Sequence, residues 1–190
     1  MDADQAGVGA VGLIADYANH VGFSKLADGD VLVLIGDSEG ALGATLYLRE
    51  ILGREDGAPP SVSLDCERKN GDFVRDLIAT GKTHAVHDLS DGGLVIAAAE
   101  MALASNIGVT LIATSHTHAH PFLFGEDQAR YLVATRDPDA LLAAAREAGV
   151  HAIVAGEAGG DDFASRELFR IPLTDLRAAH EGWLPALMAG

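Results

Sequence analysis

A run of five apolar residues, Val31–Ile35, limits how this chain can fold more than any other feature of the sequence. The run is closed by Gly36 and Asp37, a pair that favours a turn. A continuous apolar run of this length between turn residues is typical of a strand that is buried on both faces. Both faces of a sheet are buried only when other elements pack on each side of it. The run therefore predicts a layered domain.

Helix-like and strand-like segments alternate along the rest of the chain. Apolar spacing together with start and stop residues predicts helices over 42–52, 66–80, 94–105, 138–148 and 173–188. Short apolar or β-branched segments predict strands over 84–88, 109–113, 130–135, 152–156 and 167–171. Strands interleaved with helices indicate an α+β (α/β layered) fold, in which a mixed β-sheet is packed with helices.

The charge balance of the 190 residues excludes several kinds of partner. Lys and Arg number 13 against 28 Asp and Glu, which gives a formal net charge of -15. Such a surface repels phosphate backbones and anionic lipid heads, so we expect no nucleic-acid and no membrane partner. Cys66 is the only cysteine, which excludes an intrachain disulfide and a cysteine zinc site. No secretory signal and no apolar run near the ~20 residues of a membrane span is found, so we expect a cytoplasmic protein.

The segment Val86–Leu94, which leads from a predicted strand through a turn into a helix, has the most chemical content. It gathers two carboxylates, a hydroxyl and two glycines: Asp88, Asp91, Ser90, Gly92 and Gly93. The glycines allow positive φ and close backbone approach, and the first N–H groups of a helix lack partners. Such a turn can bind an anion, and Asp88 with Asp91 could hold Mg²⁺ against a phosphate. The alternative is a plain helix N-cap, made by Ser90 or Asp91.

This segment and four others resemble phosphoribosylformylglycinamidine synthase. The run His87–Leu94 (HDLSDGGL), followed by 98–102 (AAEMA), is similar to the HDxSDGGL…AEMA segment of that family. Similar short motifs follow the same order along the chain at 9–16 (GAVGLIAD), 29–36, 41–48 and 124–130 (FGEDQAR). The resemblance covers nearly the whole chain. It fits best the short form of the synthetase subunit, in its C-terminal domain of the aminoimidazole ribonucleotide synthase-like superfamily.

The resemblance implies one domain of an ATP-dependent ligase of purine biosynthesis. The whole enzyme converts formylglycinamide ribonucleotide, ATP and glutamine-derived ammonia to formylglycinamidine ribonucleotide. It implies Mg²⁺ and ATP or ADP as cofactors of the full-length enzyme. The implied partners are the preceding ATP-binding domain of the same polypeptide, a glutaminase subunit and a small accessory subunit. Residues 1–28 would then be an arm or link from the preceding domain and 29–190 the C-terminal domain, which alone is expected to be inactive.

The resemblance also suggests roles for individual residues, none of them catalytic. It places Asp88 at a metal ion and the turn residues Ser90, Asp91, Gly92 and Gly93 at the phosphates of a nucleotide. Three further residues, His87, Glu126 and Gln128, are candidates for the substrate side. Structural roles are the alternatives: His87 as a positioning or core histidine, and Glu126 and Gln128 as strand caps or partners of Arg130.

Two other interpretations of the chain stay open. It could be a domain of another ATP-dependent member of the superfamily, such as AIR synthase, selenophosphate synthetase or thiamine-phosphate kinase. It could also be a non-catalytic docking domain that packs on its neighbour through an apolar face. Separately, His116, His118 and His120 alternate, which on an extended segment places three imidazoles on one face where a metal could bind. A solvated loop is the simpler interpretation of these histidines.

Overall fold

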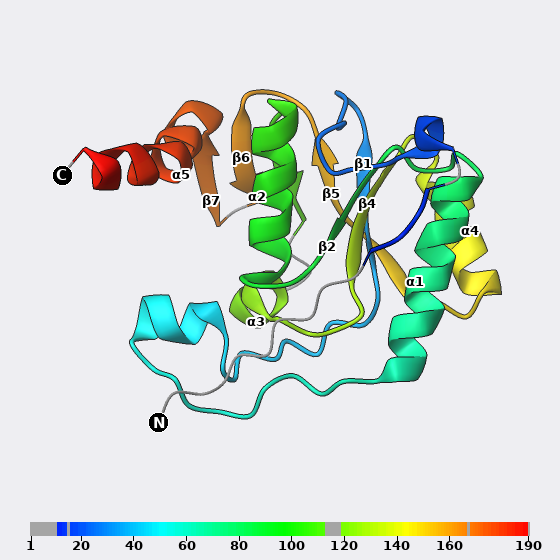
Figure 1. The fold of residues 1–190 in the computed structure, drawn as a ribbon, viewed down its shortest axis with the longest axis horizontal. Helices are drawn as coiled ribbons and strands as arrows, with labels where there is room; N and C mark the ends of the chain where they lie inside the picture. Colours follow the sequence, from blue (N-terminus) through cyan, green and yellow to red (C-terminus); the bar gives the residue numbers. More distant parts are fainter. Residues whose placement is uncertain (1–10, 15, 113–118, 167, 190) are drawn as a thin grey trace.

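The computed structural model describes residues 11–14, 16–112, 119–166 and 168–189, which form a mixed sheet with helices on both faces (Figure 1). The strands are β1 (Val31–Ile35), β2 (Ala85–Asp88), β3 (Val109–Leu111), β4 (Tyr131–Thr135), β5 (Ala152–Ala158), β6 (Asp162–Ser165) and β7 (Phe169–Pro172). Their order in the sheet is β2-β4-β1-β5-β3-β6-β7. Among the described strands, only β3 and β6 pair in parallel. This is the mixed sheet that the sequence predicts.

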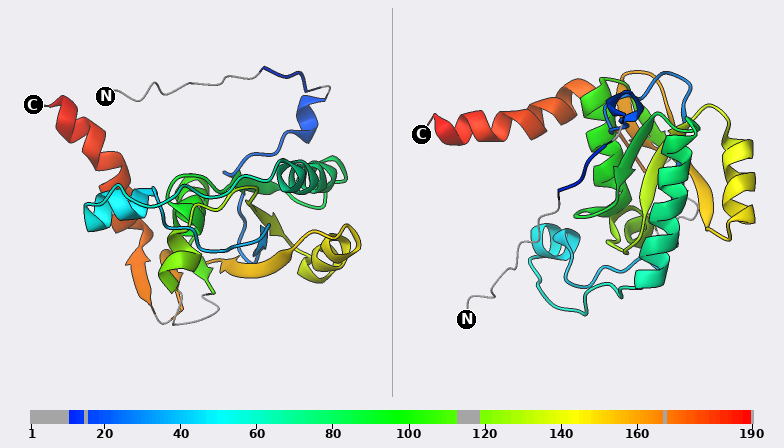
Figure 2. Two further views of the ribbon diagram at one scale, coloured as in Figure 1. Left: turned by 90° about the horizontal axis from the view of Figure 1, so that it is seen from below. Right: turned by 45° about the vertical axis from the view of Figure 1, so that its right-hand side comes forward.

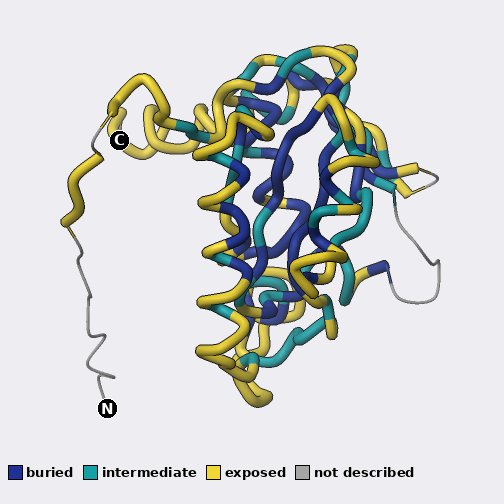
Figure 3. The backbone as a smooth tube through the Cα atoms, turned by 90° about the vertical axis from the view of Figure 1, so that its right-hand side faces the viewer, coloured by how far each residue is buried: buried dark blue, intermediate teal, exposed yellow. Residues whose placement is uncertain are grey.

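The helices differ in length and in how much of their surface is covered. They are η1 (Tyr17–Asn19), η2 (Tyr47–Ile51), α1 (Leu64–Ala79), α2 (Gly93–Ser105), α3 (Ala119–Phe124), α4 (Pro138–Glu147) and α5 (Leu173–Met188). Figure 3 shows the strands as the buried centre of the molecule and the outer turns of α5 as exposed. No helix of the described residues is long and apolar enough to cross a bilayer.

Strand β1 is an interior strand of the sheet, as its apolar sequence predicts. It pairs with β4 on one side and with β5 on the other, antiparallel in both cases. Residues Leu32 to Ile35 have no exposed surface. Alternate residues of β1 therefore enter two different cores, one on each face of the sheet.

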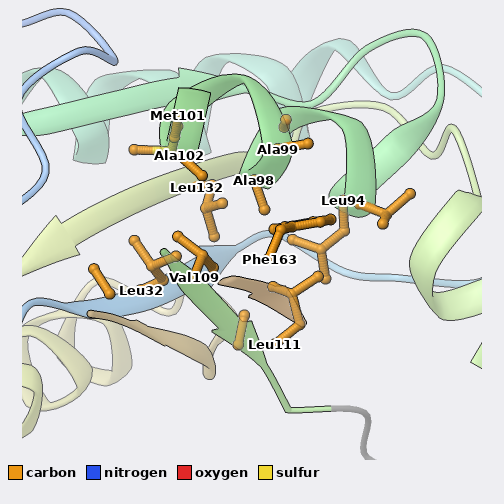
Figure 4. Packing of buried hydrophobic residues seen from close by; sticks show 14 of the residues in the cluster. Leu32, Leu94, Ala98, Ala99, Met101, Ala102, Val109, Leu111, Leu132 and Phe163 are labelled. Atoms are coloured by element: carbon orange, nitrogen blue, oxygen red, sulfur yellow. The ribbon is translucent and has the colours of Figure 1, made fainter. Parts of the chain in front are cut away.

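The two cores divide the helices between the faces of the sheet. Val33 and Ile35 contact α1 and α4, whereas Leu32 and Leu34 contact α2 and its neighbours. Figure 2 shows α2 on one side of the strands and α1 and α4 together on the other. In Figure 4, Ala98 and Met101 of α2 lie over the apolar residues of the strands. Because α2 is covered on almost every side, its sequence is apolar all round.

Most of the predicted elements are confirmed within a few residues, and three details differ. The helix expected over 42–52 begins only after Leu46 and is a π-helix at Tyr47–Ile51. Ala44 has a φ of +55°, which ends any helix there, and Gly43 lies tightly against the backbone of Ala58. Strand β6 and helix α3 were not predicted.

The predicted row of three histidines is only partly covered by the structure. His116 and His118 lie outside the described residues. His120 belongs to helix α3, not to an extended segment, and its ring stacks on Tyr47 at 5.7 Å between centroids. The prediction of an extended segment is therefore wrong for His120. The division into an arm of 1–28 and a domain of 29–190 stays a prediction.

A buried carboxylate, Asp30, fixes the entry to β1. It has no exposed surface. Its Oδ2 accepts hydrogen bonds from the Ala27 N–H and from Nε2 of His84, both at 2.7 Å, and its Oδ1 accepts one from Nε of Arg136 at 2.6 Å. Burial alone would raise the pKa of Asp30, but these donors together hold it below its ordinary value of 3.8. Asp30 thus links β1 to the segments beside β2 and β4 through charge-assisted hydrogen bonds.

We predict that Asp30→Asn lowers the free energy of unfolding by about 1–3 kcal/mol near neutral pH, because the amide carries no charge and its NH₂ group cannot accept a hydrogen bond from the donors around it. Since folding lowers the pKa of Asp30, the stabilisation is present above the unfolded pKa and is lost as the pH falls through the folded pKa. Urea unfolding at about pH 7 and about pH 3 should therefore show a smaller difference between variant and wild type in acid. The exposed Asp28→Asn is the control. An Asp30→Asn effect of the same size at both pH values contradicts the assignment.

Candidate functional site

Three loops meet at one end of the sheet. Strands β1 and β2 are both antiparallel to β4, so their C-terminal ends lie together beside the start of β4. The register sets Ile35 and Asp88 opposite the same residue, Tyr131. We call the adjoining segments 36–46, 89–93 and 124–130 the loop cluster. Figure 1 shows this end of the strands at the bottom, next to α3.

The segment 124–130, which contains the FGEDQAR motif, supplies two neighbouring carboxylates to the loop cluster. Oε1 of Glu126 accepts hydrogen bonds from the N–H of Leu46 at 2.9 Å and from the N–H of Gly92 at 2.8 Å. The carboxylate of Asp127 accepts hydrogen bonds from the N–H of Gly40 at 2.9 Å and of Ala41 at 3.0 Å. The two acids thus bind four backbone N–H groups of the other two segments.

Arg130 holds this segment in place through hydrogen bonds. Its side chain is fully buried, and its nitrogens donate hydrogen bonds to Asp127 O, Gly125 O and Ser38 Oγ. Burial lowers the pKa of the Arg130 guanidinium, while the Asp127 and Glu126 carboxylates act in the opposite direction. Because a buried guanidinium needs acceptors for its donors, Arg130 fixes the shape of the turn around it.

Gly92 and Gly93 both have the positive φ that the sequence predicts, and Gly93 also makes the predicted close backbone approach, to a group of the chain itself. Their φ angles are +79° and +68°. A Cβ on Gly93 would lie 2.3 Å from the carbonyl oxygen of Gly125. The Gly92 N–H donates to Glu126, and the Gly93 N–H donates to Ser90 O at 3.1 Å. Both N–H groups therefore have partners inside the chain.

The side chains of Ser90 and Asp91 are exposed at the tip of the turn. Neither caps helix α2: the N-cap residue is Gly92, which has no side chain to make a cap hydrogen bond. The alternative of a plain N-cap made by Ser90 or Asp91 is therefore wrong. Glu126, 34 residues away in sequence, is the acceptor for the cap N–H instead.

His87 and Asp88 face opposite sides of β2, as neighbours in a strand do. Nε2 of His87 lies 2.8 Å from Oε2 of Glu100 on α2, and its ring stacks on Phe23 at 4.7 Å between centroids. The side chain of His87 is only 12% exposed. The structure thus places the His87 side chain between β2 and α2.

The carboxylate of Asp88 is 68% exposed and lies 3.4 Å from Nδ1 of His87. It lines a groove of about 970 Å³ beside α1, together with Tyr131, Arg68 and Arg75. Burial raises the pKa of the Tyr131 hydroxyl, and the charge of Asp88 adds to this effect. Asp88 is thus an accessible anionic group at the edge of the sheet.

A divalent cation could find one ligand here, not a complete set. In the part of the chain that the structure describes, no three His, Cys, Asp or Glu side chains are gathered as a metal site. Mg²⁺ keeps several waters and is commonly held by one or two carboxylates and by phosphates of a substrate. The exposed Asp88 carboxylate fits that kind of shared site.

His87 is not brought together with the other two residues predicted for the substrate side. His87 faces α2, whereas Glu126 lies inside the loop cluster. Gln128 is exposed and lines a separate polar cavity of about 110 Å³ next to Asp127, with its Nε2 donating to Glu126 O at 3.2 Å. Sequence reasoning missed Asp127, for which the FGEDQAR motif is the only signal.

Comparison with known proteins identifies relatives along most of the chain. The sequence model of the family "AIR synthase related protein, C-terminal domain" matches residues 27–167. Phosphoribosylformylglycinamidine synthase subunit PurL of Caulobacter vibrioides is 66% identical over 182 residues, which is 96% of this chain and 25% of the relative. The PurL subunit of Methylocella silvestris is 50% identical over 184 residues, also 96% of this chain and 25% of the relative. The chain therefore spans about a quarter of the length of the curated relatives it matches.

A solved structure shows the same fold. T. maritima PurL complexed with FGAR superimposes with a TM-score of 0.70 at 18% sequence identity. The match covers 84% of this chain and 30% of the other. At this identity the likeness concerns the fold.

We predict that Gly93→Ala lowers the free energy of unfolding by about 2 kcal/mol or more, because the new methyl group meets the Gly125 carbonyl and the φ is positive. Gly81→Ala is a matched control, since Gly81 has a φ of +67° with nothing within 4 Å of its Cβ position. The control should lose only the backbone strain, about 1–2 kcal/mol. Chemical denaturation of both variants decides the point. An equal loss in the two would show that Gly93 makes no close contact.

Proposed function

Because the chain belongs to the AIR synthase related protein family, C-terminal domain, we propose that it is one domain of a phosphoribosylformylglycinamidine synthase. The observation that carries the proposal is the 66% identity to a PurL subunit over 96% of the chain. The relatives bear this name at identities down to 44%. They favour this enzyme over AIR synthase, selenophosphate synthetase or thiamine-phosphate kinase.

The whole enzyme would form an amidine from an amide at the expense of ATP. ATP would phosphorylate or otherwise activate the amide oxygen of formylglycinamide ribonucleotide, and ammonia would then displace the activated oxygen. Since this chain matches a quarter of its relatives, other domains of the polypeptide would supply most of the cleft. The existence of a PurLQS structure from T. maritima supports a glutaminase and a small subunit as partners. The whole enzyme would act in the cytoplasm, as expected from the sequence.

Within this reaction we assign the cation side to Asp88. Its carboxylate is 68% exposed, and its contact with Nδ1 of His87 is long, at 3.4 Å, so a metal ion could reach it from solvent. Mg²⁺, when bound, would neutralise phosphate charge. The neighbouring Ser90 and Asp91 are exposed and could contact a nucleotide, directly or through water. The N–H groups of Gly92 and Gly93 would need to exchange their present partners first.

The domain would thus act by electrostatics and by positioning, not by covalent chemistry. His87 is proposed as a positioning residue, because its contact with Glu100 and Phe23 holds the end of β2 against α2. T. maritima PurL has been solved with ATP and with ADP, which supports nucleotide binding by the whole protein.

We predict that Asp88→Asn in the full-length synthase raises the Mg²⁺ concentration for half-maximal activity at least about tenfold, because the amide is a poor ligand for Mg²⁺. The measurement is ammonia-dependent turnover against Mg²⁺ concentration, together with the nucleotide that remains bound after purification. The change should alter stability by less than about 0.5 kcal/mol, because Asp88 is exposed.

The exposed Asp76→Asn on α1 is the matched control and should leave the Mg²⁺ requirement unchanged. An Asp88→Asn enzyme with wild-type Mg²⁺ dependence and wild-type nucleotide content would remove Asp88 from the site.

We also predict that the 190-residue chain alone does not turn over, since the other domains are needed to complete the cleft. The test measures ATP- and ammonia-dependent loss of formylglycinamide ribonucleotide by the purified chain and by the full-length enzyme. Substantial amidine formation by the chain alone would refute the assignment of this domain as a part of the site.

A further inference from the structure

We propose that the carboxylate of Glu126 takes the place of a bound anion at the glycine-rich turn. It accepts the hydrogen bond of the N–H group that this turn would offer a phosphate, so the turn is closed without a ligand. The inference rests on contacts inside the chain and goes beyond the proposed function. It changes what the motif residues 90–93 do in this domain. The turn would connect the segments after β1 and β2, and Glu126 of the FGEDQAR motif would hold them together.

One of the two N–H groups that donate to Glu126 is of the kind that binds phosphate. Gly92 is the N-cap residue of the 13-residue helix α2, whereas Leu46 precedes the short π-helix η2. The first N–H groups of a helix lack acceptors in the helix and attract anions. Both donate to the same oxygen, Oε1, at 2.8 and 2.9 Å. A hydrogen bond to an ionised acceptor is stronger than one between neutral groups.

The donors come from parts of the chain that are far apart in sequence. Leu46 lies 80 residues before Glu126 and Gly92 lies 34 residues before it. One oxygen therefore joins the segment after β1 to the segment after β2. Asp127 adds a second tie, through the N–H groups of Gly40 and Ala41, and the Glu126 N–H donates to Ala41 O at 3.0 Å. The position of Glu126 is thus fixed by backbone contacts as well as by its own side chain.

A phosphate at the turn would compete with Glu126 for the same donor. Two anions at one N–H group would weaken each other's hydrogen bond, because their charges repel at short range. The wild-type turn should therefore ignore added anions, whereas removal of the carboxylate should leave donors that an added anion can satisfy. This difference between wild type and variant is the measurable consequence of the proposal.

The test is thermal unfolding of the 190-residue chain in chloride, in acetate and in inorganic phosphate, at constant ionic strength. Glu126→Ala should unfold about 5–10 °C below wild type in chloride, because two charge-assisted hydrogen bonds are lost. Acetate or phosphate should restore part of this loss, because either anion can occupy the vacated donors. Wild type should respond to neither anion. Glu55→Ala, an exposed acid in the loop after η2, is the matched control and should behave as wild type.

Glu126→Gln is the second variant, in case Glu126→Ala does not fold. Its amide oxygen can still accept, so it should unfold between wild type and Glu126→Ala in chloride. The proposal is overturned if Glu126→Gln unfolds at the wild-type temperature, or if acetate and phosphate stabilise wild type as much as the variants. Because the test involves neither ATP nor turnover, loss of the proposed function would leave these outcomes unchanged.

Discussion

Two neighbouring acids, Glu126 and Asp127, hold four backbone N–H groups at the end of the sheet where three segments meet. The rest of this end depends on that contact. The N–H groups belong to residues that leave β1 and β2, and β4 begins just after the two acids. Arg130, buried beneath them, satisfies the carbonyl groups of the same turn. A chain with a net charge of -15 thus uses two of its many acids as structural acceptors.

The parts of the fold that depend on local sequence could be predicted. The apolar run of β1 and the apolar helix α2 are both buried, as their apolar composition predicts. Helix α4 begins at Pro138 with Asp137 as its N-cap, and this pair is a common helix start signal in sequences. Where the local signal is weak, prediction failed. Ala44 has a positive φ, which alanine does not favour and its residue type does not predict. The helix predicted over 42–52 therefore starts too early.

Only part of the candidate site could be predicted from the sequence, for a related reason. The sequence indicated a tight turn at Gly92 and Gly93 with close backbone approach, and this geometry is present. It could not indicate which group makes the approach, because Glu126 and Gly125 are more than 30 residues away along the chain. The same applies to Asp30, whose partners His84 and Arg136 come from distant segments. Such pairings depend on topology, which spacing along the sequence does not encode.

Hydrogen exchange at the backbone N–H groups of Leu46 and Gly92 tests the central claim most directly. If one carboxylate holds both, the two groups in the wild-type chain exchange at least about 100-fold more slowly than in an unstructured loop. They should also open together, and added phosphate should leave their rates unchanged. Fast exchange at either position, or protection of Gly92 that increases with phosphate, would show that the turn is open to a ligand and would contradict the account.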